Sequence, residues 1–135
     1  MNNRVYLDAS FWIAYRDERQ DAHAQAKEIL PRLFRERPLF VTTMPVVCEI
    51  HAYFSRSRVK KRLVLDDLFS NPVVQIEEVS PTDRQQALQL LRTQLDKEYS
   101  LCDALSFVVM RRLQLKRALA FDDHFRQFGG FEIIN

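Results

Sequence analysis

Apolar residues occur along the chain in two alternating patterns. Short runs rich in Val, Leu, Ile and Phe are typical of buried strands, and longer segments repeat apolar positions every three or four residues, as one face of a helix does. The predicted strands span residues 4–8, 38–43, 73–79, 117–121 and 131–134. The predicted helices span residues 11–15, 21–37, 44–57, 57–71, 82–99 and 99–110. This alternation predicts an α/β fold: a three-layer α/β/α sandwich with a mainly parallel central sheet.

Punctuating residues refine the predicted helices. Ser10 is expected to cap the helix at 11–15, and Pro31 to kink or end the helix at 21–37. The helix at 82–99 carries its apolar stripe at Leu88, Leu91 and Leu95. Residues 122–130 are interpreted as a short acidic turn before the last strand.

Composition excludes several classes of protein. A length of 135 residues without a Gly, Ser or Pro-rich linker predicts a single domain spanning residues 1–135. Cys48 and Cys102 lie inside apolar segments, so free thiols are expected rather than a zinc site. With neither a signal peptide nor an apolar run long enough to cross a bilayer, a cytoplasmic protein is expected, with no membrane partner. The net charge of +2 neither requires nor excludes a polyanionic partner.

Four acidic residues occupy corresponding places relative to the strands. Asp8 ends the first strand and Asp122 follows the strand at 117–121. Glu49 lies early in the helix after the second strand, and Asp103 lies in the first turn of its own helix. All four have apolar neighbours. Because parallel strands end at the same edge of a sheet, we expect these carboxylates to converge there.

Converging carboxylates need a compensating positive charge, because isolated buried carboxylates are costly. No Lys or Arg adjoins any of the four in sequence, and carboxylate oxygens suit the hard ions Mg²⁺ and Mn²⁺. The chemistry predicted for such a site is metal-assisted hydrolysis, in which an activated water attacks a phosphodiester phosphorus in line. The alternative is that each acid separately ends a strand or caps a helix. Ser100 and Asp103, for example, have the spacing of a capping box.

The order of these motifs resembles a known family. "YLDAS", "PVVCEIH", "YSLCDALSFVVM" and "AFDDHF" are similar to the acidic segments of PIN-domain nucleases, and the closing "DDHFRQFGGFEII" resembles the VapC-type toxins of toxin–antitoxin pairs. The resemblance implies a Mg²⁺- or Mn²⁺-dependent endoribonuclease that leaves a 5′-phosphate and a 3′-hydroxyl. It also implies a cognate antitoxin and a homodimer. The metal ligands and catalytic residues that it implies are Asp8, Glu49, Asp103 and Asp122.

Three more residues belong to the candidate site. Ser10 and Ser100 match family positions that usually hold Ser or Thr, where a hydroxyl orients a carboxylate or holds water, although helix capping explains them equally well. Asp123 follows Asp122 directly and is a possible substitute ligand. Successive side chains of a strand point to opposite faces, so only one of the pair should face the site. We expect this to be Asp122, with Asp123 facing solvent or capping the segment after it.

An RNA substrate requires a basic surface, and residues 56–62 and 111–117 are the two candidates. Each can instead be a solvated helix face. Loop shape and backbone contacts govern RNA recognition, so the RNA target stays open.

Three other functions remain as alternatives. A metal-dependent phosphatase of the haloacid-dehalogenase type also uses acids placed like Asp8 and Asp122, but it needs a second Asp where Ser10 stands. A metal-free nuclease would use two histidines, and the surroundings of His23, His51 and His124 do not indicate such a pair. A non-catalytic RNA-binding or interaction protein on the same fold would not need all four acids.

Overall fold

The computed structural model describes residues 3–135, and their five strands form one parallel sheet in the order β3-β2-β1-β4-β5. The strands are β1 (Arg4–Leu7), β2 (Leu39–Thr43), β3 (Val74–Glu77), β4 (Arg117–Leu119) and β5 (Glu132–Ile134). β1 is central and pairs with both β2 and β4. The predicted parallel sheet is confirmed, because every pairing among the described strands is parallel.

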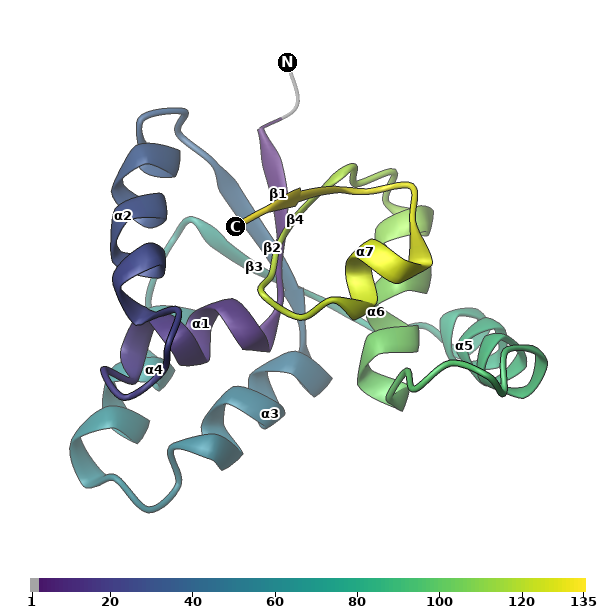
Figure 1. Ribbon diagram of the computed structural model, residues 1–135, viewed down its shortest axis with the longest axis horizontal. Helices are drawn as coiled ribbons and strands as arrows, with labels where there is room; N and C mark the ends of the chain where they lie inside the picture. The colour runs from purple at the N-terminus through teal and green to yellow at the C-terminus, as the bar shows by residue number, and fades with distance from the viewer. Residues whose placement is uncertain (1–2) are drawn as a thin grey trace.

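Helices cover both faces of this sheet. They are α1 (Ala9–Arg16), α2 (His23–Phe34), α3 (Met44–Tyr53), α4 (Arg58–Phe69), α5 (Pro81–Thr93), α6 (Leu101–Arg112) and α7 (His124–Phe128). Helices α1 to α4 lie on one side and α5 to α7 on the other (Figure 1). The chain runs from β1 outward to β3 and then crosses to β4, and right-handed crossovers therefore place the later helices on the opposite face. The three-layer sandwich is confirmed, with its topological switch between β1 and β4.

The centre of the sheet is held by a buried hydrogen-bonded tyrosine as well as by apolar packing. Val5, Tyr6 and Leu7 are fully buried. The Tyr6 hydroxyl donates to Ser106 Oγ at 2.6 Å and lies 3.3 Å from Thr43 Oγ1. Burial raises the pKa of Tyr6, so the hydroxyl stays neutral and joins β1 to β2 and α6.

Local signals place most helix starts. The Ser80–Asp83 and Ser100–Asp103 pairs both form complete capping boxes, which begin α5 and α6. The expectation that Ser10 caps the first helix is wrong. Asp8 is the N-cap, because its backbone is extended and its carboxylate accepts from the Ser10 N–H at 3.1 Å.

Two predicted helices end earlier than expected. α2 ends at Phe34 rather than at residue 37, and Pro31 does not end it, since Leu30 and Leu33 on either side of the proline are buried in the core. α5 ends at Thr93, because Gln94 leaves the helical conformation, and Leu95 is 85% exposed. The packed face of α5 consists of Ala87, Leu90 and Leu91, so only Leu91 of the predicted apolar stripe belongs to it.

The predicted acidic turn contains the short helix α7. Phe125 of this helix is fully buried, and the ring of Phe128 stacks on that of Phe107 with centroids 4.4 Å apart. These contacts with α6 stabilise a helix too short to form alone.

Two predictions from composition can be compared with the structure. Cys48 and Cys102 are free cysteines, as expected. Within residues 3–135, no helix has both the length and the apolar character needed to cross a membrane.

Candidate active site

The four predicted acids line one hollow beyond the carboxyl ends of β1 and β4. We call it the acidic hollow, and its volume is about 350 Å³. Its polar residues are Asp8, Ser10, Gln20, Glu49, Tyr53, Asp103 and Asp122, and its apolar ones are Ile13, Ala14, Ala22 and Phe121. The acids come from β1, β4, α3 and α6, so both faces of the sheet contribute to this hollow.

Asp8 is the most deeply placed carboxylate of the group. It follows β1 directly, is 5% exposed, and accepts hydrogen bonds at Oδ2 from the Ser10 hydroxyl at 2.5 Å and the Ser10 N–H at 3.1 Å. Burial raises the pKa of Asp8 to about 7; the bonds from Ser10 oppose this rise, and the charges of Asp103 and Glu49 add to it. The protein alone thus leaves the negative charge of Asp8 poorly compensated.

Ser10 connects the two strand ends that carry Asp8 and Asp122. Its hydroxyl donates to Asp8 and accepts from the backbone N–H groups of Phe121 at 3.0 Å and Asp122 at 3.2 Å. A hydroxyl has one proton and two lone pairs, so these contacts use its full hydrogen-bonding capacity. Ser10 therefore orients Asp8 and fixes its position relative to Asp122.

Asp103 both caps a helix and belongs to the hollow. Its Oδ2 accepts from the Ser100 N–H at 3.0 Å, while Ser100 Oγ accepts from the Asp103 N–H at 3.0 Å. The same Oδ2 lies 2.7 Å from His124 Nδ1. Ser100 is exposed, is not part of the hollow's lining, and acts as the helix cap. Capping thus orients Asp103 without removing it from the acidic group.

His124 is the site residue that the sequence analysis missed. Its Nδ1 lies 2.7 Å from Asp103 and 3.2 Å from Asp122, and its backbone N–H donates to Asp122 Oδ1 at 2.7 Å. Partial burial lowers the pKa of His124, but the hydrogen bond to Asp103 and the charge of Asp122 outweigh that effect and leave the pKa raised. Asp103, Asp122 and His124 together could hold a metal ion. The signal available in the sequence was the place of His124 two positions after Asp122.

The adjacent acids Asp122 and Asp123 separate as predicted. Asp122 faces the acidic hollow, whereas the Asp123 side chain is 74% exposed and pairs with Arg126 at 3.2 Å. Of the two alternatives expected for Asp123, exposure to solvent is confirmed. Asp123 also occupies the N-cap position of α7, but among the described residues its side chain makes no cap bond, and Asp122 accepts from the His124 N–H instead. Their relative importance for metal binding stays a prediction.

Glu49 approaches the hollow from α3 and is exposed to solvent. Burial, and then the nearby charge of Glu49, raises the pKa of the Cys102 thiol, which therefore stays neutral and is not a metal-binding thiolate.

The chemistry of this donor set fits a divalent cation. The hollow presents four carboxylates, and across residues 3–135 its lining includes no Lys or Arg. Oxygen ligands suit Mg²⁺ and Mn²⁺, and a cation would compensate the charge that burial disfavours on Asp8.

Comparisons with known proteins agree with this geometry. A family model described as "PIN domain" matches residues 5–130. The chain is 30% identical over 131 residues to the 23S rRNA-specific endonuclease VapC20 of Mycobacterium tuberculosis, covering 96% of this chain and 97% of that protein. The crystal structure of that VapC20, described as a sarcin-ricin loop cleaving toxin, superposes with a TM-score of 0.84 at 29% identity, over 97% of this chain and 99% of that one.

A more distant structure shares the fold. FitAcB of Neisseria gonorrhoeae has a TM-score of 0.69 at 14% identity, covering 97% of this chain and 96% of that one. The matched family model, the level of identity to VapC20 and the near-complete coverage together lead to one conclusion. The chain belongs to the PIN domain family, and within it to the VapC-type endonucleases.

Proposed function

We propose that this protein is a Mg²⁺- or Mn²⁺-dependent endoribonuclease, the toxin of a toxin–antitoxin pair, and that its target is a loop of 23S ribosomal RNA. The observation that carries the proposal is the convergence of Asp8, Glu49, Asp103 and Asp122 on one hollow without a compensating Lys or Arg in its described lining. The choice of RNA rests on the 30% identity to VapC20.

The roles of the residues follow from their contacts. Asp8, Glu49, Asp103 and Asp122 would hold the cation. When bound, a divalent cation lowers the pKa of water and stabilises negative charge on phosphate oxygens. Ser10 keeps the Asp8 carboxylate directed into the hollow, and His124 holds Asp103 and Asp122 beside each other. The opening of the hollow toward solvent at Glu49 allows an RNA backbone to enter.

The direct test is cleavage of 23S rRNA by the purified protein with Mn²⁺ or Mg²⁺. We expect discrete fragments with 5′-phosphate and 3′-hydroxyl ends, and no cleavage in EDTA. Asp8→Asn should lower cleavage by at least about a hundredfold, because it removes an anionic ligand. Asp123→Asn is the matched control, since it removes the same charge outside the hollow, and it should retain most activity.

Two results would contradict the proposal. Cleavage that persists in EDTA and leaves cyclic phosphates would indicate a metal-free mechanism. Equal losses in Asp8→Asn and Asp123→Asn would show that the hollow has no special role.

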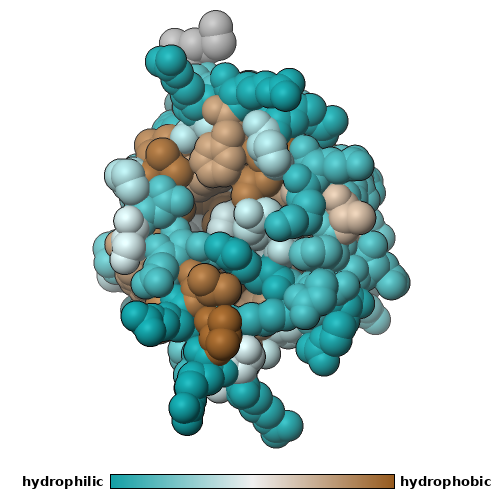
Figure 2. All heavy atoms as spheres, turned by 90° about the vertical axis from the view of Figure 1, so that its left-hand side faces the viewer, coloured by the Kyte–Doolittle hydropathy of each residue, from teal (hydrophilic) through white to brown (hydrophobic). Residues whose placement is uncertain are grey.

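The partner expected by resemblance is an antitoxin protein, and an unpaired apolar surface supports it. Val59, 69% exposed, and Leu63, 38% exposed, lie one helical turn apart on α4. Figure 2 shows the side of the molecule bearing α2 and α4, where brown apolar patches interrupt a hydrophilic surface. A structurally related chain occurs in a toxin–antitoxin complex from Klebsiella pneumoniae, with a TM-score of 0.67. The homodimer also stays a proposal, and light scattering with and without the antitoxin tests both assemblies.

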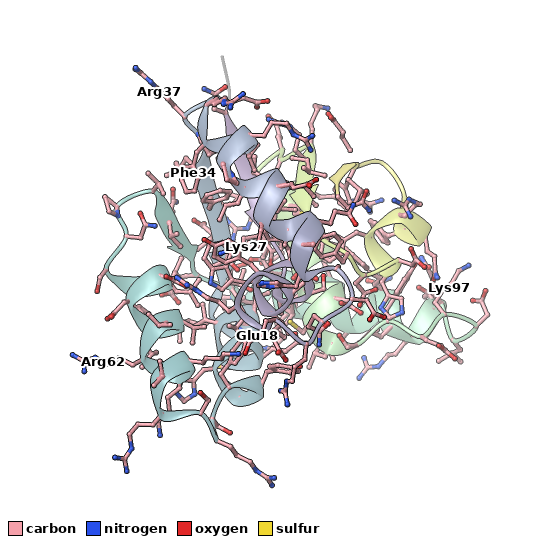
Figure 3. All side chains as sticks on the ribbon, turned by 60° about the vertical axis from the view of Figure 1, so that its left-hand side comes forward. Glu18, Lys27, Phe34, Arg37, Arg62 and Lys97 are labelled. Atoms are coloured by element: carbon pink, nitrogen blue, oxygen red, sulfur yellow. The ribbon has the colours of Figure 1, made fainter. Side chains whose placement is uncertain are left out.

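Of the two basic segments, residues 56–62 lie closer to the acidic hollow. Tyr53 lines the acidic hollow and also a neighbouring one formed with Arg56 and Lys60. Lys60 is partly neutralised by Glu18 at 2.6 Å, whereas Arg62 extends outward from α4 (Figure 3). This segment can therefore receive the RNA strand next to the cleaved bond.

A further inference from the structure

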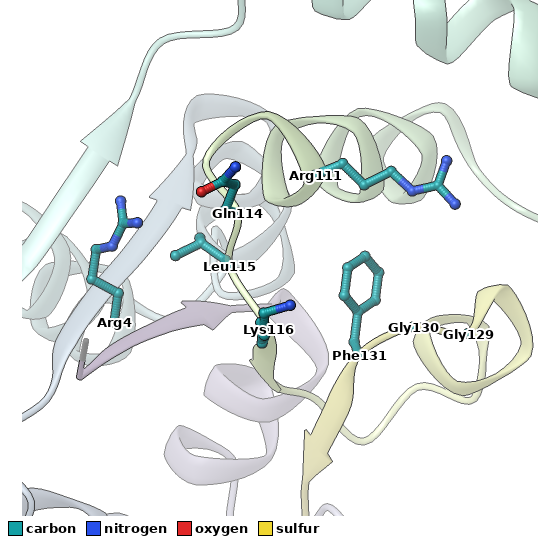
Figure 4. A pocket seen from close by; sticks show the side chains of 8 residues that line it. All are labelled: Arg4, Arg111, Gln114, Leu115, Lys116, Gly129, Gly130 and Phe131. Carbon is teal, nitrogen blue, oxygen red and sulfur yellow. The ribbon is translucent and has the colours of Figure 1, made fainter. Parts of the chain in front are cut away.

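A second hollow lies at the opposite edge of the sheet and is lined by basic groups. We call it the basic hollow; its volume is about 570 Å³. Arg4, Arg111, Gln114, Lys116 and Phe131 supply its functional side chains, and across residues 3–135 its lining includes no acidic residue. These side chains come from the start of β1, the end of α6 with its following turn, and the start of the last strand segment (Figure 4).

The cations of the predicted basic segment 111–117 have different environments. Arg112 is bound to Asp83 and Glu77, and Arg117 is bound to Glu36, so these two stabilise the fold. Arg111 and Lys116 are exposed and form no ion pair with any described residue. Arg111 is held over the ring of Phe128 at 4.4 Å, which orients its guanidinium without neutralising it.

Gln114 adds a polar side chain at a place where the backbone favours glycine. It lies just after α6 with φ +57°, and its N–H bonds to the Arg111 carbonyl while that of Leu115 bonds to the Met110 carbonyl. This is the Schellman arrangement, in which the left-handed residue is usually Gly. A glutamine there adds an amide to the lining of the basic hollow, despite an unfavourable backbone conformation.

Phe131 adds an aromatic side chain to the basic lining of the hollow. Its half-buried ring lines the same hollow as Lys116. Gly129 and Gly130, which have positive φ angles, line the neighbouring part of the hollow with backbone atoms alone. A phosphate alone needs only cations and amide donors. An aromatic face beside them suits a nucleotide, whose base stacks while its phosphate meets the guanidinium and ammonium groups.

We propose that the basic hollow is a second RNA-binding site, which takes a phosphate and a stacked base of the substrate away from the cleaved bond. The inference rests on the proposed ribonuclease function for its choice of ligand. Asp103 and Arg111 are at opposite ends of α6, about 12 Å apart along the helix axis. A folded RNA can contact both hollows, whereas a dinucleotide bound at the acidic hollow is too short to reach the basic one.

The test uses a labelled stem–loop of 23S rRNA and the Asp8→Asn protein, which binds without cutting. The double variant Arg111→Gln/Lys116→Gln should bind RNA roughly tenfold or more weakly. The slope of log K against the logarithm of the salt concentration should become shallower by about 2, because two phosphate contacts are lost. In the protein with Asp8 intact, cleavage of a dinucleotide should not change.

The matched control is Arg35→Gln with Arg37→Gln. Both arginines are exposed, lie in the turn after α2 and are absent from the lining of the basic hollow, and Figure 3 shows Arg37 extending away from the body of the protein. This control removes the same charge and should bind RNA normally. Gln114→Gly is a second variant, which should melt at the same or a higher temperature yet bind the stem–loop several-fold more weakly.

Three results would overturn the inference. The first is an equal loss of RNA affinity in the two double variants, and the second is no loss in either. The third is unchanged RNA binding together with loss of polyglutamate binding in Arg111→Gln/Lys116→Gln, which would assign the hollow to an acidic peptide. The proposed catalysis can fail separately. If the native protein cleaves no RNA but binding still depends on Arg111 and Lys116, the second site is supported and the ribonuclease function is not.

Discussion

At the scale of single residues, Asp8 illustrates how burial changes the chemistry of a carboxylate. It lies among apolar side chains and other acids, and within residues 3–135 its carboxylate accepts hydrogen bonds only from the hydroxyl and the N–H of Ser10. Removal from water and like charge both favour its protonated form. A bound cation would reverse that preference, so proton and metal compete for the same carboxylate.

We therefore expect the metal-free protein to lose stability as the pH rises. The pKa of Asp8 is about 7 in the folded state against a reference of 3.8, so the folded state binds the extra proton between these values. The raised pKa of His124 acts in the same direction above its reference of 6.5. The lowered pKa of Asp17, held down chiefly by Arg19, matters only below this window. Melting in EDTA at about pH 5 and about pH 8 measures the effect.

The control for this pH dependence is Asp8→Asn, which cannot titrate at that position. Its melting temperature should change less over the same range. A native protein that is equally stable at both pH values would contradict the burial argument.

Asp103 gives the second prediction at the residue scale. Asparagine can still accept from the Ser100 N–H, so Asp103→Asn should cost less than about 1 kcal/mol of unfolding free energy. It cannot supply an anionic ligand, so cleavage should fall by at least about a hundredfold. Thermal melts and RNA cleavage, measured on one preparation, separate the two effects. Normal cleavage by this variant would reduce Asp103 to a helix cap.

At the scale of elements, two identical motifs serve different ends. Ser80–Asp83 and Ser100–Asp103 start the neighbouring helices α5 and α6 with the same hydrogen bonds. Asp83 then binds Arg112 of α6 and joins the two helices, whereas Asp103 faces the acidic hollow. The local motif is the same, and the tertiary environment decides whether its carboxylate is structural or chemical.

This pair provides an internal comparison for mutagenesis. Ser80→Ala and Ser100→Ala should each destabilise the protein by about 1 kcal/mol, because each removes one cap bond. Only Ser100→Ala should also weaken Mn²⁺ binding, since it loosens Asp103. Isothermal titration of Mn²⁺ into both variants measures the difference, and equal metal affinities would argue against a positioning effect of the cap.

At the scale of the whole molecule, the strand order creates the acidic hollow. The chain reverses its direction across the sheet between β1 and β4, so their carboxyl ends open a crevice between the two helical layers. α3 and α6 then supply acids from opposite faces. The site therefore exists only when both layers are assembled, and a ligand bound there should stabilise the entire fold.

Metal addition tests that coupling. At a free Mn²⁺ concentration a hundred times the dissociation constant, linkage adds about 2.7 kcal/mol to the unfolding free energy. For a chain of this size the melting temperature should rise by roughly 10 °C. Asp8→Asn should show a much smaller rise, and an unchanged native melt would contradict a metal site in this hollow.

Most of the fold could be predicted from the sequence because its signals are local. Apolar runs marked the strands, and the Ser100–Asp103 pair marked the start of α6. The errors lie where long-range packing competes with local preference. Phe128 stacked on Phe107 converts a predicted turn into α7, and of the two effects expected of Pro31 the end of the helix does not occur, since buried Leu30 and Leu33 flank the proline.

The acidic residues were recognisable from sequence because Asp8 and Asp122 follow strands, and Glu49 and Asp103 lie on helices that follow them, so that local pattern determines their edge of the sheet. The serines next to Asp8 and Asp103 could also be named from the sequence, whereas the contacts between distant segments could not. Ser10 reaches a backbone 112 residues away, and His124 meets Asp103 across 21 residues. The run at 111–117 was visible as charge, but packing decided that Arg112 and Arg117 form ion pairs while Arg111 and Lys116 line the basic hollow. Periodicity sets which way a side chain points along its own element, whereas strand order and helix packing decide what it meets.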